Sequence, residues 1–371
     1  MNYMREIAAL ELAILAKELR EFDGFYIDKF YEESTGSFRM RLSKGGKREN
    51  LRIMLKVGAW RTSSIETGGG APTNFAMAVR SRLRGFHIEN AGQMAGDRVL
   101  EFRLSNGKEA ASLIVEMMGR GNLIITDSSM KITLAYSVHV FRDRSIRPGA
   151  AYVPPKNDSV DYGKLDPEIR LRFQAAGKEA SLITFLTKNI NIGALYIEEA
   201  LRRAGINPKD KISSIQEEQI ERILLSIDSV VRESEAGSYY MYAADGRKAD
   251  FSVCSISKYS GLKRTELGSV QALLDDFYAD RVEEEADNTQ VEELESSIAK
   301  QRELMRGMDE KIASYKNAGE AILNNMGRIN MLIDELKRRR RATKEELQEM
   351  FPDIVIKELD LKGKKITIGI D

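Results

Sequence analysis

Two acid–arginine groups have the residue types and spacing to recognise RNA. Asp97 and Arg98 are adjacent, and Glu116 and Arg120 flank Met117-Met118-Gly119. An arginine can stack on a splayed base or bind phosphate, and a carboxylate can accept hydrogen bonds from base amino groups or a 2′-hydroxyl. Adjacent strand residues point to opposite faces, so Asp97 and Arg98 are not expected to pair only with each other. The structural alternative is a hairpin-turn aspartate beside an exposed arginine.

The second group also has two interpretations. Gly119 and Gly121 permit a positive φ or a close backbone approach, so the strand is expected to break here. Either Glu116 and Arg120 face an RNA ligand from the edge of a sheet, or they close a tight β-turn as a surface ion pair.

Positive charge is concentrated in the first half of the chain. The 371 residues carry 57 Lys+Arg and 57 Asp+Glu, but residues 39–150 carry 19 basic against 9 acidic residues. This excess indicates a nucleic-acid-binding surface, although an ordinary solvated surface would account for the charge equally well. The candidate RNA-phosphate contacts are Arg80, Arg82, Arg84, Arg338, Arg339, Arg340 and Arg341, and the alternative for the last four is a charged helix end.

Composition argues against several kinds of site. The single cysteine, Cys254, excludes a disulfide framework or a thiolate metal cluster. His87 and His139 leave no His-rich metal site and little room for histidine catalysis, so the composition argues against a conventional enzyme, and we expect no metal and no cofactor. The first 22 residues scatter charges among apolar residues and no apolar run is long enough to span a membrane, so we expect a cytoplasmic protein.

Periodicity predicts an α+β N-terminal region. The spacing over 4–20 predicts a helix, and strands are expected at 25–27, 38–42 and 51–57. Thr73 should cap a helix over 74–83. A strand meander follows at 86–91, 98–104, 111–117, 123–127 and 132–136, and prolines between 148 and 167 indicate a boundary near 155–165.

The next region is expected to be helical from 165 to 235. Gly193 lies between two short predicted helices, a pattern typical of a helix–hairpin–helix or of a plain helical pair. Strands are predicted at 239–242 and 251–255. Trp60 is expected in the core or a hairpin, and Cys254 as a small buried hydrophobe.

A heptad pattern runs from Val291 to Leu336, with twelve of fourteen a and d positions apolar. It predicts a long coiled-coil helix, and alternation over 354–370 predicts a small sheet beyond it. The apolar seam needs a partner helix, so we expect either a dimer through the seam or a chain that has lost its return helix.

Six motifs together resemble the NFACT family of ribosome-quality-control proteins, of the RqcH type and archaeal-like. They occur in family order and cover essentially the whole chain. They are Pro72-Thr73-Asn74-Phe75, Gln93 with Asp97-Arg98, Glu116-Met117-Met118-Gly119-Arg120 with Asn122 and Asp127, Arg147-Pro148-Gly149 with Tyr152 and Pro154-Pro155, Gly193 with Arg203-Ala204-Gly205, and Gly319-Glu320 with Ile322 and Asn325.

The resemblance implies a domain order. It gives an NFACT-N domain at 1–157, with a mixed sheet resembling the N-domain of formamidopyrimidine-DNA glycosylases, and a helix–hairpin–helix domain at 158–280. A protruding coiled-coil helix at 281–341 and a partial β subdomain at 342–371 follow. The NFACT-R domain and return helix of the family are missing, which suggests a shortened chain.

The resemblance also implies a function. Such proteins bind large ribosomal subunits that still carry peptidyl-tRNA, and recruit an aminoacyl-tRNA, here expected to be alanyl-tRNA, for mRNA-independent tailing of the nascent chain. The partners are then large-subunit rRNA, tRNA and the nascent-chain complex. The tRNA-binding residues would be Asp97, Arg98, Glu116, Met117, Met118, Gly119 and Arg120.

Three rival functions remain. A glycosylase would need an N-terminal proline nucleophile and a zinc finger, whereas this chain has Asn2 and Tyr3 and one cysteine. A fibronectin-binding adhesin would need export. A coiled-coil interaction protein without an RNA role would explain the seam but not the basic N-terminal region.

Overall fold

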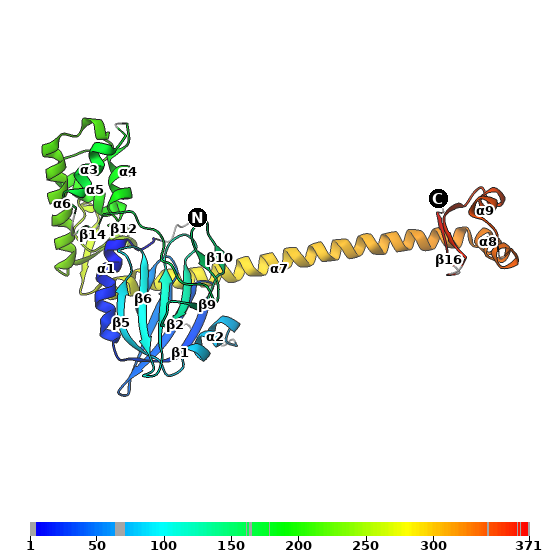
Figure 1. Ribbon diagram of the computed structural model, residues 1–371, viewed down its shortest axis with the longest axis horizontal. Helices are drawn as coiled ribbons and strands as arrows, with labels where there is room; N and C mark the ends of the chain where they lie inside the picture. The colour runs from blue at the N-terminus through cyan, green and yellow to red at the C-terminus, as the bar shows by residue number, and fades with distance from the viewer. Residues whose placement is uncertain are drawn as a thin grey trace. The chain divides into compact units, whose positions relative to one another are not determined.

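The chain divides into two compact units, Met1–Thr289 and Gln290–Asp371. The computed structural model (Figure 1) describes residues 5–63, 71–160, 162, 165–177, 179–339, 341–361, 363 and 365–369, with the side chains of 280–297 left undescribed. The predicted domains 1–157 and 158–280 both lie in the first unit, and the division between them stays a prediction.

A nine-stranded sheet dominates the first unit. Its order is β4-β3-β2-β1-β5-β6-β7-β8-β9, and every neighbouring pair is antiparallel. The expectation of a mixed sheet is therefore wrong. Short turns join most of these strands, and such turns can connect only antiparallel neighbours. The strands are β1 Tyr26–Ser34, β2 Ser37–Lys44, β3 Lys47–Met54, β4 Gly58–Arg61, β5 His87–Gln93, β6 Val99–Ser105, β7 Ala110–Glu116, β8 Asn122–Asp127 and β9 Ile132–Ala135.

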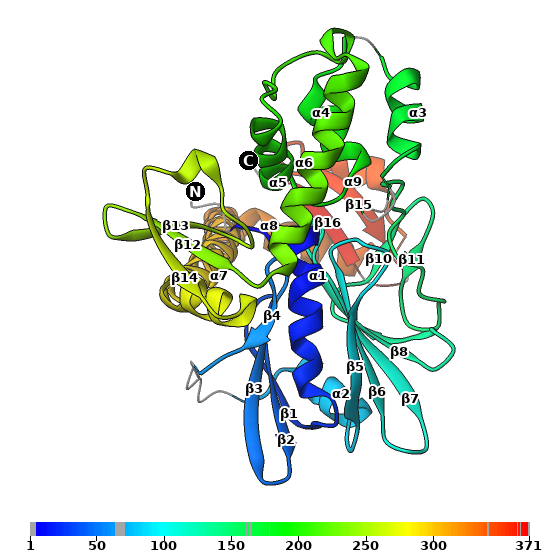
Figure 2. The same cartoon turned by 90° about the vertical axis from the view of Figure 1, so that its left-hand side faces the viewer.

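The sheet consists of two halves that pack on each other. In the β1–β5 ladder only Tyr26 and His87 pair, and backbone hydrogen bonds between residues 24–27 and 86–88 complete the junction of β1–β4 with β5–β9. Helix α1 (Ala9–Glu18) packs on β5 and runs along this junction (Figure 2). On the far side Phe38 of β2 meets Tyr136, which follows β9, with ring centroids 5.0 Å apart. The core therefore lies between the two halves.

Helix α2 (Asn74–Arg82) connects the halves along the chain. Its predicted cap is confirmed, because the Thr73 hydroxyl accepts a hydrogen bond from the Ala76 amide at 3.1 Å. Phe75 packs its ring against Phe38 and Tyr136 and so closes the core between the two halves.

The helical region and its helical hairpin are confirmed. The helices are α3 Glu168–Ala175, α4 Leu182–Asn189, α5 Ala194–Arg203 and α6 Glu217–Glu235. Gly193 begins α5 with φ of 101°, and a Cβ there would lie 2.7 Å from the Cβ of Ala8. Only glycine lets this turn lie so close to the segment before α1.

A three-stranded sheet and the start of a long helix complete this unit. The sheet, β13-β12-β14, contains Tyr239–Ala244 (β12) and Arg247–Ser252 (β13), and also Lys263–Leu267 (β14), which the sequence did not predict. Helix α7 (Val270–Asn324) begins eleven residues before the predicted start at 281. Its first turns are part of the core, since Phe277 and Tyr278 are fully buried.

The second unit contains the rest of α7 and a small α+β body. Helices α8 (Met326–Arg338) and α9 (Lys344–Met350) pack with a hairpin of β15 (Val355–Asp360) and β16 (Lys365–Gly369), so the predicted terminal sheet is confirmed. The predicted continuous helix is interrupted at Asn325, whose amide group donates to the Ala321 carbonyl at 3.0 Å. Such side-chain bonding competes with the helical ladder.

The heptad stripe of α7 is exposed where its side chains are described. Met305, Met308, Ile312 and Tyr315 are 62–75% exposed, and Val291 and Leu294 lie outside the described side chains. A coiled coil requires a second helix against this stripe, and that pairing stays a prediction.

Two further hairpin strands, β10 (His139–Val140) and β11 (Ser145–Ile146), follow β9 and were not predicted.

In the part of the chain that the structure describes, no helix is long and apolar enough to cross a membrane.

Candidate nucleic-acid interface

The structure brings the two predicted acid–arginine groups together at one end of two neighbouring strands. Arg98 immediately precedes β6 and Met117 immediately follows β7, and the Met117 amide donates to the Arg98 carbonyl at 2.9 Å. Val99 and Glu116 form the next pair of the ladder. Asp97-Arg98 and residues 116–120, separated by about twenty positions in sequence, thus form one edge.

Asp97 is held in a tight turn. Ala95 and Gly96 have φ of 52° and 63°, and the Asp97 amide donates to the Met94 carbonyl at 3.0 Å, so the predicted hairpin turn is confirmed. Asp97 Oδ1 accepts from the Arg98 amide at 2.7 Å and from Asn191 Nδ2 at 3.2 Å. Its Oδ2 has no hydrogen-bond partner among the described residues and is available to a ligand.

Arg98 does not form a side-chain pair with Asp97, as the strand geometry predicted. Its Nη1 lies 2.5 Å from Oε2 of Glu6, and the two side chains are 26% and 42% exposed. An ion pair this exposed contributes little to stability, so a phosphate could replace Glu6 at small cost. The Arg98 guanidinium is therefore held in place by a weak ion pair and can still bind a phosphate.

Glu116 is buried and paired, but not with Arg120. Arg144, 28 residues later, binds it through both terminal nitrogens, with Nη2 3.0 Å from Oε2, and the Tyr152 hydroxyl donates to Oε1 at 3.0 Å. Burial raises the pKa of Tyr152 and the Glu116 charge raises it further, so the phenol keeps its proton. Glu116 therefore holds this end of the sheet together, and the turn-closing ion pair with Arg120 is absent from the described contacts.

The turn after β7 presents its last residues to solvent. Met117 is buried and Met118 half-buried, whereas Gly119 and Arg120 are exposed. Gly119 and Gly121 have φ of 61° and 72°. The Arg120 guanidinium has no partner among the described residues, so of the seven predicted tRNA-binding residues it is the most accessible cation.

The other predicted arginines fall into two groups. Arg80 is half-buried: its Nε donates to the Phe30 carbonyl at 2.7 Å and its guanidinium stacks on Tyr31, a structural role. Arg82 and Arg84 are exposed near the end of α2.

The arginine run at 338–341 lies at the end of α8 in the second unit. Arg338 is the last helical residue, Arg339 pairs with Glu335 at 2.7 Å, and Arg341 is exposed. Arg340 lies outside the described residues. The predicted charged helix end is confirmed, and phosphate binding there stays a prediction.

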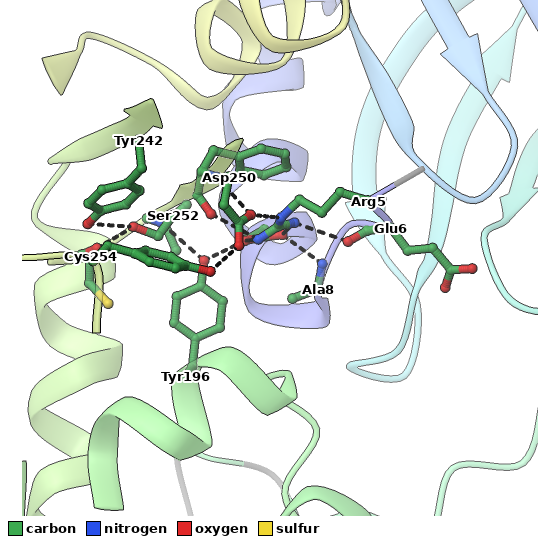
Figure 3. A network of polar contacts seen from close by, with 12 residues as sticks. Arg5, Glu6, Ala8, Tyr196, Tyr242, Asp250, Ser252 and Cys254 are labelled. Carbon is green, nitrogen blue, oxygen red and sulfur yellow. Dashed lines mark hydrogen bonds and ion pairs between the residues drawn. The ribbon is translucent and has the colours of Figure 1, made fainter. Parts of the chain in front are cut away.

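A second polar cluster lies beneath the surface at the junction of α1, α5 and β13 (Figure 3). The Arg5 guanidinium donates to Glu11 at 2.6 and 2.8 Å, to Asp250 at 2.5 Å, and to the carbonyls of Glu6 and Phe251 at 3.0 Å. Tyr196 donates to Glu11 at 2.5 Å.

Every ionised group of this cluster is saturated by its neighbours. Glu11 also accepts from the Ala8 amide at 2.7 Å, and Tyr259 donates to Asp250. Burial and the Glu11 charge raise the pKa of Tyr196 well above its ordinary value. No group is left to act on a substrate, so we assign the cluster a structural role. Among the described residues no group of three or more His, Cys, Asp or Glu could hold a metal ion.

The remaining singled-out residues are structural. Trp60 is 1% exposed and stacks on Tyr278, and Cys254 is buried with its pKa raised by burial to about 12. Both predictions are confirmed. His87 belongs to β5 and His139 to β10.

The residues that position this edge were not predicted from the sequence. Asn191, in the turn of the helical hairpin, donates to the Gly96 carbonyl and to Asp97, and thereby ties the helical region to the β5–β6 turn. Asn191 lies two residues before Gly193, in the predicted turn between two helices, and this position could have indicated its role. Arg144 and Glu6 carried no comparable signal.

Known proteins match both the sequence and the fold. The family described as NFACT N-terminal and middle domains matches residues 9–347. The archaeal Rqc2 homolog aRqcH of Methanocaldococcus jannaschii is 22% identical over 329 residues, covering 85% of this chain and 48% of that protein. The Rqc2 homolog RqcH of Bacillus subtilis is 25% identical over 250 residues, covering 62% of this chain and 40% of that protein.

The chain thus spans less than half the length of these two relatives. Among solved structures, the fibrinogen binding protein from Staphylococcus aureus superimposes with a TM-score of 0.59 at 19% identity, covering 73% of this chain and 98% of that chain. At that identity the likeness concerns the fold.

Proposed function

We propose, because this chain belongs to the NFACT family, that it is a ribosome quality-control factor. In this proposal it binds large ribosomal subunits that carry peptidyl-tRNA after a stall and recruits an aminoacyl-tRNA, alanyl-tRNA, for C-terminal tailing without mRNA. Relatives named as Rqc2 homologues in an archaeon and a bacterium support the quality-control role.

The observation that carries the RNA-binding part is the shared edge of Asp97-Arg98 and the turn at 116–120. It combines a carboxylate oxygen without a partner among the described residues, a weakly paired arginine and an exposed arginine, Arg120. Base amino groups and 2′-hydroxyls suit the carboxylate, and phosphates suit the arginines.

The same proposal gives the protein a binding role rather than a catalytic one. The ribosome makes the peptide bond, while this chain holds the incoming tRNA and large-subunit rRNA in the cytoplasm. The saturated cluster around Arg5 is consistent with that role, because it offers no nucleophile or base to a substrate.

RNA recovered with the protein tests the function. The tagged chain is isolated from the cytosol of its own host at low and at moderate salt, and the retained RNA is sequenced. We expect large-subunit rRNA together with one tRNA class, without small-subunit rRNA. Folded protein that retains neither RNA contradicts the proposal.

A double substitution tests the site. Asp97→Ala with Arg98→Ala should leave folding intact and abolish tRNA recruitment and tailing in the protein with its full family domains. Arg103→Ala is the matched control, since this arginine lies on β6 close to Arg98, is 65% exposed and forms an ion pair, among the described residues, only with Glu101 at 3.4 Å. Normal tailing by the double variant refutes the site assignment.

A second candidate is the adhesin function, because the fold neighbour is named a fibrinogen binding protein. Its test is binding of the purified chain to immobilised fibrinogen and fibronectin in the presence of nuclease. Saturable binding that survives RNA removal, together with an RNA-free isolate, favours this candidate.

A further inference from the structure

Exposed apolar side chains are concentrated in one short stretch of the first unit. Eight large apolar residues are exposed among its described residues, and four of them lie between 138 and 153. They are Val138 (60%), Val140 (75%), Phe141 (46%) and Val153 (51%). Four exposed apolar side chains within sixteen residues make this stretch a candidate interaction site.

Phe141 lies at the turn of a short hairpin in this stretch. Strands β10 and β11 pair His139 with Ile146 and Val140 with Ser145, and the Phe141 amide donates to the Arg144 carbonyl at 2.8 Å. The turn between them is therefore only Arg142-Asp143. The ring contacts His139 and Arg144 and remains 46% exposed, so part of its surface is open to a ligand.

Arg144 joins this hairpin to the candidate interface. Its guanidinium carbon lies 4.8 Å from the centroid of the Phe141 ring, and the same guanidinium binds Glu116 and the Val153 carbonyl. The Arg144 charge is balanced by Glu116, whose strand leads directly into the turn of Arg120. Phe141 packs against the Arg144 side of this ion pair, and Arg120 lies four residues after its Glu116 side.

The surroundings of Phe141 are positively charged. Arg142 and Arg147 are exposed, and neither has a partner among the described residues, whereas Asp143 is the only acidic residue between 138 and 153. An apolar ring flanked by unpaired arginines fits a polyanion with flat apolar groups, which is a nucleic acid strand with unstacked bases.

We propose that Phe141 is a stacking platform for an unpaired RNA base, with Arg142 and Arg147 contacting the flanking phosphates. The inference rests on the proposed function and extends its RNA interface from the 97–98 and 116–120 edge to the β10–β11 hairpin. The preferred ligand is a loop of tRNA, because bases in a paired stem are not free to stack on a side chain.

Binding measurements on the full chain test the stacking. Fluorescently labelled bulk tRNA and a fully paired RNA duplex of similar charge are titrated against wild type, Phe141→Leu, Phe141→Trp and Leu225→Ala. Leu225 is a control, being 63% exposed on α6. We expect Phe141→Leu to weaken tRNA binding about 5- to 100-fold, Phe141→Trp to retain it, and duplex binding to remain unchanged.

Salt dependence tests the phosphate contacts separately. Arg142→Gln should make the negative slope of log affinity against log salt shallower by about 0.7, whereas Phe141→Leu should leave the slope unchanged. Photo-crosslinking of 4-thiouridine-containing tRNA should place an adduct on the peptide that contains Phe141.

The outcomes separate the two proposals. If Phe141→Leu binds tRNA as tightly as the wild-type protein does, the stacking site alone is overturned. That result is expected if the hairpin docks on a protein instead. Wild-type protein that binds neither RNA overturns the proposed function together with this site. Equal weakening by Phe141→Leu and Phe141→Trp also refutes stacking, because tryptophan keeps the aromatic face.

Discussion

Replacing Arg5 by methionine should strongly destabilise the first unit. All five N–H groups of the Arg5 guanidinium are engaged, two of them by Glu11, whose side chain is fully buried. Burial opposes the charge of Arg5, but the Glu11 carboxylate raises the pKa of Arg5 well above its ordinary value. Methionine retains the apolar stem and removes the charge, so it isolates the polar contribution.

The loss of unfolding free energy can be estimated from the contacts that Glu11 and Asp250 keep when Arg5 is removed. Without Arg5, the donors left to Glu11 among the described residues are the Ala8 amide and the Tyr196 hydroxyl. Removing one partner of a buried ion pair costs about 3–5 kcal/mol. Asp250 is 21% exposed and adds less, because water can replace part of its contact.

Urea unfolding followed by tryptophan fluorescence measures the effect. Trp60 is the one tryptophan of the chain, is buried, and stacks on Tyr278 with centroids 5.5 Å apart, so it reports on this unit. With a denaturant dependence of about 3 kcal/mol per molar urea, the unfolding midpoint should fall by roughly 1–1.7 M.

Two companion variants make the reasoning refutable. Adding Glu11→Gln to Arg5→Met should recover part of the lost stability, because it removes the uncompensated charge. Lys17→Gln breaks an exposed pair with Glu235 and should cost less than about 1 kcal/mol. If Arg5→Met costs no more than Lys17→Gln, the cluster does not stabilise the fold as argued.

Two further stability predictions follow. Gly121→Ala should cost about 2–5 kcal/mol in urea unfolding, because φ is 72° and the new Cβ would also lie 2.6 Å from the Cβ of Leu55. Gly119→Ala has a positive φ but open space around it, so it should cost about 1–2 kcal/mol. Equal costs would contradict the packing argument. Burial raises the pKa of Cys254 from 9 to about 12, so the unfolded chain loses this proton first and stability should fall from pH 9 to pH 12, by about 2 kcal/mol at pH 10.5. Cys254→Ala should lose stability less steeply over that range, and identical alkaline profiles would rule out this thiol as the cause.

Features that depend on neighbouring residues could be predicted from the sequence. The cap at Thr73 and the turn at Ala95-Gly96 are local, and the structure has both. The clustering of Asp97-Arg98 with the 116–120 turn was also within reach, since consecutive antiparallel strands bring the start of one beside the end of the next.

Features that depend on distant partners were not predictable. The sequence suggested Arg120 as the ion-pair partner of Glu116, but in the fold the partner is Arg144. Arg144 lies in a hairpin whose strands have two residues each, too short to show an alternation of apolar and polar residues. Strand β14 is exposed and polar, Lys-Arg-Thr-Glu-Leu, and therefore lacks an apolar pattern. In each case the deciding contact is tertiary and leaves no periodic signal.

The burial of the first turns of α7 has a consequence for the order in which the chain can fold during synthesis. Arg5 forms an ion pair with Asp250, the Arg61 amide donates to Gln271, and Trp60 stacks on Tyr278. Proteins emerge from the ribosome N-terminus first, so these early residues are made long before the partners that bury them. The first unit cannot close its core until Tyr278 has emerged, and a ribosome that halts before Asp250 leaves Arg5 without its second carboxylate partner and Trp60 without the ring that stacks on it.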